Sequence, residues 1–496
     1  MRWALKQYLV QHARGVYASM CNPLVAQKKT FKNLKTLLEG SEIAAQTGFD
    51  QCHSLEDCRR LPSSNSESMK SLFSRAFELG AAESRIFGRS KILAFGRTSG
   101  TKGEHKDIPL NQAYLEALDR SLIRVVGSYL HTTGEWETLL ARKQILLGSR
   151  PLIGASPTGL PISDISGLLL TRTWKILRWL YIPRHEDAWI QDWATKAELI
   201  LEQAYGQNVY SIAGIPALAM DFSRRAREKY NVTHLNQLWP NLRFYVYGGV
   251  HLSQEQRKEM HRTWFDSERK LSFVETYIAT EGSVAFSYDP DDEGLALNSL
   301  ENLYLFKTES DESSFLFAHE LQEGQTYSIH ITTPGGLINY RLGDRVEVVS
   351  RRPLRIRILG RENDEISMTG EKITLEQLDL ALAAAGLNPA RFGSHRPVVW
   401  VEHSEKPHLV WGIPEKTGDL SGEAWATRLD EALCHLNTLY AEALIREKVI
   451  GESRIVSVPT SVFESYYNSK LGVGQFKPKR IFNSRADFAA VYKWQP

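Results

Sequence analysis

The stretch "FGRTSGTKGEHKDIPL" (residues 95–110) decides how this chain is interpreted. Among its three glycines stand the hydroxyl side chains of Thr98, Ser99 and Thr101, with Lys106 close behind. Glycine has no Cβ, so the backbone N–H groups of such a loop can approach an anion closely and form a nest around it. The composition therefore predicts a phosphate-binding loop. From this segment alone, the alternative is a solvated glycine turn.

The residues on either side of this loop predict a strand, a flexible loop and a helix, in that order. "KILAF" (91–95) is a short apolar strand that runs directly into the glycines. Beyond the loop, apolar residues recur at helical spacing between Leu115 and Tyr129, and Asn111 is a candidate N-cap. Other motifs fail on spacing, because no G-x-x-x-x-G-K-[ST] pattern occurs and "GASPTG" (154–159) misses the nucleophile elbow by one residue.

The charge balance argues against a nucleic-acid partner. The 496 residues contain 60 Lys and Arg against 58 Asp and Glu, so no basic field covers the chain as a whole. Cys21, Cys52, Cys58 and Cys434 match no zinc-site spacing. We therefore expect reduced thiols and a cytoplasmic location.

The most apolar stretch is "ISGLLLTRTWKILRWLYIP" (165–183). Arg172, Lys175 and Arg178 interrupt it, which is unlike a segment that spans a bilayer. The N-terminal residues lack the apolar core and cleavage site of a secretory signal. We expect a buried helix here and no membrane span; a helix on a membrane surface is the alternative.

The pattern along the chain indicates a large N-terminal body and a smaller C-terminal domain. Residues 187–236 predict mostly helix, whereas 315–360 alternate as strands do. A boundary follows at "GREND" (360–364). We place the domain limits at 1–359 and 360–496.

The residues after this boundary predict a compact α+β unit. Thr374 and Gln377 form a capping box at the start of a helix. Two strands then precede a long predicted helix near 423–449, and a further strand follows it.

The opening motif and several further stretches resemble the motifs of one protein family. "TSGTKGEHK" resembles the [ST]-S-G-T…G-E-x-K signature of the Gretchen Hagen family of acyl acid amido synthetases, which belongs to the adenylate-forming superfamily. The other matching stretches follow in the family's order along nearly the whole chain. They are "YVYGGV" (245–250), "ETYIATEG" (275–282), "TPGGLINYRLGDRV" (333–346), "GREND" with "GEKITLEQL" (370–378), and "TSVFESYYNSKLGVGQFKPKR" (460–480).

The resemblance implies an α/β adenylate-forming fold. In that fold, a large N-terminal α/β domain with a β-barrel-like subdomain is followed by a small, mobile α+β domain that closes over the active site. It also implies an enzyme that uses ATP and Mg²⁺ to adenylate a carboxylic acid, releases pyrophosphate, and transfers the acyl group to an amine, usually that of an amino acid. Formation of a CoA thioester from the same adenylate is one alternative. A nucleotide-binding protein without catalysis is another, and no carrier-protein segment is evident.

The resemblance assigns phosphate contacts to particular residues. Ser99, Gly100 and the two threonines Thr98 and Thr101 would cradle the triphosphate. Lys106 would assist them.

Two further motifs would complete the nucleotide site. Tyr277 would pack against adenine beside Gly248 and Gly249. Glu281, next to Thr280, would help to hold Mg²⁺, because one carboxylate with phosphate oxygens suits that ion.

The resemblance assigns the remaining residues to the ribose and to the small domain. Asp344 would accept hydrogen bonds from the ribose hydroxyls, and Arg361 would lie at the hinge. Lys477 would enter with the small domain and neutralise charge during adenylation. Glu281 and Lys477 are thus the predicted catalytic residues. Glu281, Asp344 and Lys477 could instead be solvated surface groups, and Tyr277 could be an ordinary core residue.

The chain also departs from the family's plant members. Its opening loop is one residue shorter, and Asn339 stands where they usually have arginine. We therefore expect a divergent, microbial member of the family. These departures leave the identity of its amine substrate undetermined. Apolar residues near 161–183 would wall the acyl pocket or form ordinary core; they are Leu168, Leu169, Trp174 and Trp179.

Overall fold

The computed structural model divides the chain into two compact units. It describes residues 2–80, 85–98, 106–136, 142–148, 151–171, 175–190, 192–249, 252, 254–266, 270–308, 314–361, 365–366, 368–369, 371, 373–387, 392, 395–415, 422–470 and 478–494. The first unit holds the described residues up to 249 and from 261 to 358. The second holds those from Leu359 to 470 and from 478 on, together with the short segment Leu252–Met260. No helix among these residues is both long and apolar enough to cross a membrane.

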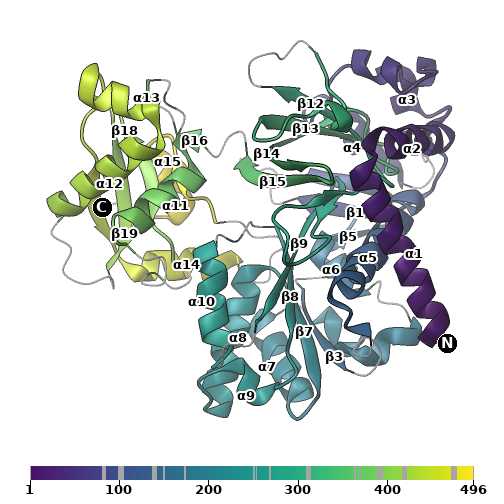
Figure 1. Cartoon of the computed structure of the whole chain (residues 1–496), viewed down its shortest axis with the longest axis horizontal. Helices are drawn as coiled ribbons and strands as arrows, with labels where there is room; N and C mark the ends of the chain where they lie inside the picture. The colour runs from purple at the N-terminus through teal and green to yellow at the C-terminus, as the bar shows by residue number, and fades with distance from the viewer. Residues whose placement is uncertain are drawn as a thin grey trace. The chain divides into compact units, whose positions relative to one another are not determined.

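A seven-stranded sheet forms the centre of the first unit (Figure 1). Its strand order is β11-β10-β9-β8-β7-β3-β6, and the strands from β9 to β6 run parallel. Their bounds are β3 (Lys143–Leu147), β6 (Tyr181–Ile182), β7 (Val209–Gly214), β8 (Phe244–Gly248), β9 (Ser272–Ala279), β10 (Gly282–Phe286) and β11 (Ala296–Leu297). Because parallel strands share a direction, the carboxyl ends of β7, β8 and β9 meet at one edge of this sheet.

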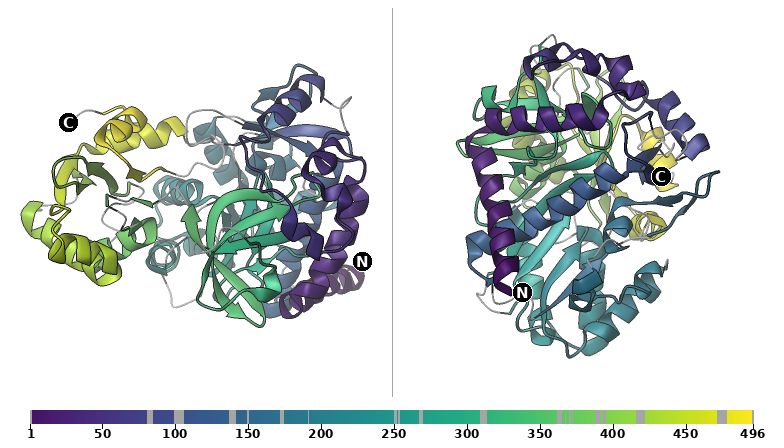
Figure 2. Two further views of the ribbon diagram at one scale, coloured as in Figure 1. Left: turned by 90° about the horizontal axis from the view of Figure 1, so that it is seen from above. Right: turned by 90° about the vertical axis from the view of Figure 1, so that its right-hand side faces the viewer.

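Two long helices cover one side of this sheet. The helix α1 (Arg2–Cys21) lies alongside α5 (Gln112–Thr133), as Figures 1 and 2 show. Apolar residues of both helices, such as Val16 and Tyr129, pack in one cluster with Phe244 of β8 and Val274 of β9. Asn111 caps α5 as predicted, because its side chain accepts a hydrogen bond from the Tyr114 N–H at 2.9 Å.

The crossover segments pack against the same sheet. The helix α7 (Trp193–Ala204) packs against β3, and α8 (Pro216–Tyr230) packs against β7. The prediction that 187–236 is mostly helical is confirmed, although an unpredicted strand, β7, lies between these helices. Over 165–183 the single predicted helix is wrong. A short α6 (Ile165–Thr171) is followed by a 3₁₀ turn (Lys175–Leu180) and the edge strand β6.

Two smaller sheets complete the first unit. One has the order β2-β1-β5-β4 and the other is the antiparallel β12-β13-β14-β15. Apolar residues of both sheets share a large core with the N-terminal helices α2 (Pro23–Leu38) and α4 (Lys70–Leu79). Their strand bounds are β1 (Ile92–Thr98), β2 (Lys106–Asn111), β4 (Gly154–Ala155), β5 (Pro161–Ser163), β12 (Leu303–Thr308), β13 (Thr326–Thr332), β14 (Tyr340–Arg351) and β15 (Leu354–Arg361).

The strand β2 corrects one prediction, since the sequence was expected to pass from the glycine loop straight into a helix. In the structure, β2 pairs antiparallel with β1, and Thr98 faces Lys106 across the loop. The glycine loop therefore connects two paired strands.

The second unit is a sheet with helices on both faces. Its order is β20-β19-β18-β21, with bounds β18 (Val398–Glu402), β19 (His408–Pro414), β20 (Arg454–Val458) and β21 (Ile481–Phe482). Alternate residues of β18 enter two different cores, as the two-residue period of a strand requires. Val399 packs with α11 (Leu375–Ala384) and α12 (Gly422–Leu436), while Trp400 packs with α14 (Thr460–Lys470) and α15 (Arg485–Tyr492).

Helix ends in the second unit follow their capping residues. Thr374 and Gln377 form the predicted capping box of α11. The single long helix predicted near 423–449 is wrong, because α12 ends at Leu436. There the Asn437 side chain accepts from the Tyr440 N–H at 3.0 Å and starts a new short helix.

Candidate active site

The carboxyl ends of β8 and β9 form the edge of the candidate site. The strand β8 ends at Gly248 and Gly249, and β9 turns back into β10 through a two-residue loop of Thr280 and Glu281. In open α/β sheets, ligands bind outside the carboxyl ends of the strands. The motifs singled out in the sequence therefore lie where such a sheet binds its ligand.

Glycine at the end of β8 allows the backbone of β9 to approach closely. A Cβ on Gly248 would lie 2.6 Å from the carbonyl oxygen of Thr276 and 2.7 Å from its Oγ1. Gly249 has a φ of +82°, in the left-handed region that disfavours other residues. A side chain at Gly248 would therefore require a shift of the strand, and one at Gly249 would strain the backbone.

The strand that leads into the glycine loop contacts the Thr280–Glu281 turn. A Cβ on Gly96 of β1 would lie only 2.3 Å from Cγ2 of Thr280. Two residues further on, β1 ends at Thr98. The glycine loop therefore begins beside the turn that carries Glu281.

Glu281 lies close to the first turn of α5. The Tyr114 hydroxyl donates a hydrogen bond to the carbonyl oxygen of Ala279 at 3.3 Å. Burial, and after it the negative charge of Glu281, raise the pKa of Tyr114 above its ordinary value. Ala279 stands two residues before Glu281, so the hydrogen bond from Tyr114 brings this turn close to the buried phenol.

The turn 333–336 adds polar groups to the same region. Asn111 donates from Nδ2 to the Gly335 carbonyl at 3.3 Å, and a Cβ on Gly335 would contact Tyr114 at 3.2 Å. The Thr333 hydroxyl is buried and has no hydrogen-bond partner among the described residues. Within the described part of the chain, the Thr333 hydroxyl is therefore available to form a hydrogen bond with a ligand or with water.

A β-bulge positions Asp344. Opposite Ile329 of β13, the strand β14 inserts residues 342–344, because Ser328 faces Arg345 whereas His330 faces Arg341. Gly343 in this bulge has a φ of +76°, and bulges of this kind re-aim the next side chain.

The carboxylate that the bulge aims is held by Tyr277. The Tyr277 hydroxyl donates a hydrogen bond to Asp344 Oδ2. The Tyr277 ring is only 7% exposed and belongs to the core of the first unit, which fits the ordinary-core alternative as well. The hydrogen bond nevertheless links the β9 and β14 motifs directly.

The donor set near Glu281 fits a magnesium ion that also binds phosphate. No group of three or more His, Cys, Asp or Glu side chains suited to a metal occurs within the described ranges. Mg²⁺ is commonly held by one or two carboxylates plus substrate phosphates and water, and not by a complete protein cage. The single half-buried carboxylate of Glu281 meets that requirement.

Several predicted site residues are placed only in part or not at all. Thr98 and Arg361 are the last residues of β1 and β15. Lys106 is exposed, and its Nζ donates to Ser66 Oγ at 2.6 Å. The remaining members, which lie outside the described residues, are Ser99, Gly100, Thr101 and Lys477.

The expected acyl-pocket residues divide between core and surface. Leu168 and Leu169 pack against the cluster around Tyr114, near the candidate site. Trp179 is 54% exposed, and Trp174 lies outside the described residues.

Sequence reasoning missed one buried cation at the same sheet. Lys196 of α7 is 2% exposed, and its Nζ donates to the Gly148 carbonyl at 3.4 Å, just beyond the end of β3. Burial lowers the pKa of Lys196 to about 8, while the charge of Asp164 opposes the shift. No sequence pattern marks Lys196, because the surrounding residues have the ordinary pattern of an amphipathic helix.

Comparison with protein families identifies the chain by its domains. The GH3 family N-terminal domain matches residues 13–211, its central domain matches 300–361, and its C-terminal domain matches 377–486. No curated protein shows significant sequence similarity to the chain.

Solved structures share the fold at low sequence identity. A structure of GH3.15 acyl acid amido synthetase superposes with a TM-score of 0.76 at 15% identity, covering 96% of this chain and 94% of that one. AtGH3.15 acyl acid amido synthetase in complex with 2,4-DB gives 0.69 at 16% identity, covering 99% and 95%. A 2-hydroxyisobutyryl-CoA ligase in the postadenylation state gives 0.60 at 12% identity, covering 94% and 90%.

These likenesses confirm the predicted α/β adenylate-forming fold. The three domain matches occur in chain order and together cover most of the sequence. Of the motifs on which the family resemblance was based, those at Gly248, Thr280–Glu281 and the turn 333–336 lie close together in the first unit. The chain therefore belongs to the GH3 family.

Proposed function

We propose that this protein is an ATP-dependent ligase that joins a small carboxylic acid to an amine, most simply that of an amino acid. One observation carries the proposal. The turn with Glu281, the end of β1 and the Tyr277–Asp344 pair converge from separate motifs at the carboxyl edge of the sheet. A protein of the GH3 family with this arrangement has the parts needed to activate an acid with ATP.

The family pattern supports the nucleotide-binding roles that we propose, and the closeness of Glu281, Tyr277 and Asp344 to the end of β1 is consistent with them. We assign the triphosphate to the loop after β1, with Lys106 at its far end. Adenine and ribose are assigned to Tyr277 and Asp344, beside the glycines of β8. The phosphate group comprises Thr98, Ser99, Gly100, Thr101 and Lys106, and the nucleoside group comprises Gly248, Gly249, Tyr277, Thr280, Asp344 and Arg361.

The reaction has two displacements. In the first, an oxygen of the acid's carboxylate attacks the α-phosphorus of ATP, and the bond to the pyrophosphate oxygen breaks. In the second, the amine nitrogen attacks the acyl carbon, the bond to AMP breaks, and the amine loses a proton as the amide forms. The first step brings two anions together, so the protein's main contribution there is positioning and charge neutralisation.

The proposed catalytic residues act on that charge, Lys477 directly and Glu281 through a metal ion. A bound Mg²⁺ would screen the phosphate oxygens, and Glu281 is the residue we assign to hold it. Lys477 would supply a positive charge to the α-phosphate. We propose domain limits of 1–359 and 360–496, with the smaller domain closing over the site and bringing Lys477 with it.

A thioester-forming ligase is the second candidate, favoured by the shared fold with a CoA ligase. The two candidates use the same adenylate and differ in the final nucleophile. A protein that binds nucleotide without catalysis is the remaining alternative, and the retained Glu281, Asp344 and Lys477 argue against it.

Isotope exchange between ATP and pyrophosphate tests the proposal. We expect exchange with at least one member of a panel of aromatic and aliphatic carboxylic acids, because adenylation is reversible. Mass spectrometry of reactions with mixed amino acids and CoA should then detect an amide. Exchange that yields only a CoA thioester would favour the second candidate. No exchange with any acid would leave the non-catalytic alternative.

Replacing Lys477 with alanine should separate the two steps. We expect a loss of acid-dependent exchange on the order of 100-fold, because a cation that stabilises the transition state is removed. Amide formation from a preformed adenylate should change by less than about threefold, since that step displaces AMP without adding phosphate charge. Lys479→Ala is the control, because the Lys479 Nζ lies over the Phe482 ring of the same unit, 5.0 Å from its centroid. Equal losses in both steps would contradict the proposed role of Lys477.

A further inference from the structure

A cleft at the outer edge of the central sheet lies apart from the candidate active site. Its volume is about 470 Å³, and the strands β3 and β6 and the helix α7 contribute to its lining. Lys143, the first residue of β3, stands at the amino end of that strand. The candidate active site lies at the carboxyl ends of β8 and β9, so the cleft occupies a different region of the sheet.

The lining of the cleft is strongly basic. Lys143, Arg178, Arg184 and His185 line it, with Glu186 as the one carboxylate among the described lining residues. Among the described residues, none of these four basic side chains forms an ion pair. Like charges gathered in a concave surface repel one another and attract anions from solution.

One contact and one unpartnered atom describe these cations. The Lys143 Nζ donates a hydrogen bond to the carbonyl oxygen of Trp179, so its charge faces no carboxylate. The Nε of Arg178 is buried and has no hydrogen-bond partner within the described residues. A buried guanidinium nitrogen without an acceptor is unfavourable, and the cations that line the cleft around it favour an anion there.

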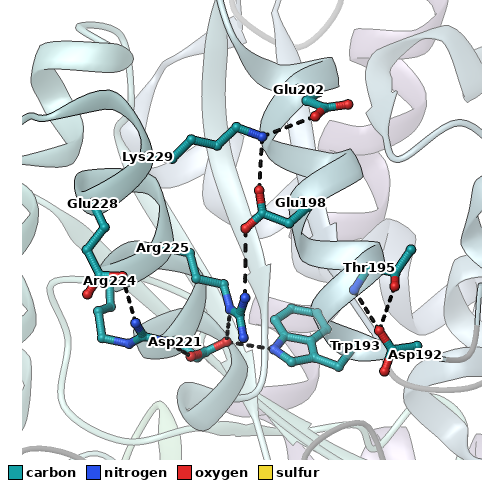
Figure 3. Close-up of polar contacts among 10 residues, drawn as sticks. All are labelled: Asp192, Trp193, Thr195, Glu198, Glu202, Asp221, Arg224, Arg225, Glu228 and Lys229. Carbon is teal, nitrogen blue, oxygen red and sulfur yellow. Dashed lines mark hydrogen bonds and ion pairs between the residues drawn. The ribbon is translucent and has the colours of Figure 1, made fainter.

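The neighbouring helices show the opposite arrangement, drawn in Figure 3. Arg224 and Arg225 of α8 both contact Asp221, at 2.7 Å. Lys229 lies 2.9 Å from Glu198 and 3.1 Å from Glu202 on α7. Cations on this side of α7 are thus matched by carboxylates, which makes the unmatched set in the cleft a local feature and not a general property of the surface.

An exposed aromatic ring completes the cleft. Trp179 is 54% exposed, and the Lys143 Nζ lies 5.8 Å from its ring centroid. An indole face beside cations suits a flat ring that carries a negative group, because stacking and charge attraction then act together. A volume of about 470 Å³ is within the range of small-molecule pockets.

We propose that this cleft binds a small organic anion with an aromatic ring, held by Arg178 and Arg184 through its negative group and by Trp179 through its ring. The negative group is a phosphate or a carboxylate, so the ligand is a nucleoside monophosphate or an aromatic acid. The inference does not depend on the ligase reaction, because it rests on the lining of the cleft alone.

Calorimetric titration tests the proposal with three probes: AMP, phenylacetate and inorganic phosphate. The cleft variant Arg178→Ala/Arg184→Ala should bind AMP or phenylacetate at least 10-fold more weakly at one site. The control Arg224→Ala/Lys229→Ala removes the same charge from the paired network and should bind as the wild type does. Selective loss for AMP identifies a phosphate ligand, and selective loss for phenylacetate identifies a carboxylate ligand.

Further variants separate the cleft from the active site and from misfolding. Glu281→Gln should retain the binding that the cleft variant loses. Trp179→Phe should weaken the ring-bearing probes less than the arginine changes do, and Arg178→Lys/Arg184→Lys should restore part of the affinity. Equal binding of all three probes by the cleft variant and the wild type would overturn the proposal. Wild-type binding of inorganic phosphate as tight as that of AMP would overturn the role of the ring.

Discussion

Replacing Glu281 with glutamine is expected to lower acid-dependent ATP–pyrophosphate exchange by a factor on the order of 100. The amide has nearly the same shape as the carboxylate, but it offers no negative charge to Mg²⁺. Glu281 lies half-buried in the tight turn between β9 and β10, so the substitution leaves the packing of the sheet unchanged. Raising the Mg²⁺ concentration should recover part of the lost rate, since weaker binding of the ion is the cause.

A second turn glutamate provides the matched control. Glu323 is exposed in the turn before β13, far along the chain from the β9–β10 hairpin. Glu323→Gln should leave the exchange rate and its dependence on Mg²⁺ unchanged. If Glu281→Gln retained exchange within about threefold of the wild type, the assignment of Glu281 to the metal would be wrong.

Replacing Arg480 with alanine is expected to destabilise the second unit by about 3 kcal/mol. The Arg480 guanidinium is only 7% exposed and forms two contacts with Asp379, at 2.7 and 2.9 Å. Its Nε also donates to the Pro397 carbonyl at 3.0 Å. Removal of the cation leaves the mostly buried Asp379 carboxylate without its main partner, and the resulting loss of folding free energy is large. Urea unfolding, followed by a probe confined to this unit, would measure the change.

The control is a pair of the same chemistry on the surface. Arg446 lies 3.5 Å from Glu442 and is 78% exposed, so Arg446→Ala should change stability by less than about 0.5 kcal/mol. Equal effects of the two substitutions would show that the Asp379 pair does not stabilise the unit.

The Asp379 pair also predicts the direction of acid sensitivity. Burial raises the pKa of Asp379, but the charge and hydrogen bonds of Arg480, and then the charge of Arg396, outweigh it and lower the pKa below the ordinary value. Because the folded pKa is the lower one, the stabilisation is complete above the unfolded pKa of about 4 and is lost as the pH falls through the folded value. Arg480→Ala should therefore flatten the acid limb of the stability profile.

The site motifs could be found in the sequence by their resemblance to a family, because each is a short contiguous segment. The roles that this resemblance gives to Glu281 and to the Gly248–Gly249 pair stay predictions. The convergence of these motifs follows from the parallel sheet, whose carboxyl ends lie together. The sequence could not predict how Asp344 is aimed, because the bulge at Gly343 depends on the register of β13 against β14.

The missed strands have physical causes as well. Pro109 lies within β2, and proline cannot donate to a sheet, so the segment did not have the pattern of a strand. The structure accommodates it because β2 is an edge strand. The strand β7 is a run of six residues between two helices, too short for its period to outweigh theirs. The basic cleft was not predicted, although most of its lining lies in the single segment 178–186, because no sequence pattern shows that this segment borders a cavity.

The tight contacts at Gly96 and Gly248 constrain how this enzyme can diverge. At both positions even alanine would displace a neighbouring strand or turn, so substitutions there at the rim of the candidate site are disfavoured. New preferences for the acid or the amine must therefore evolve through substitutions at other residues of the substrate pocket. Directed libraries aimed at altered substrates would do best to leave both glycines untouched.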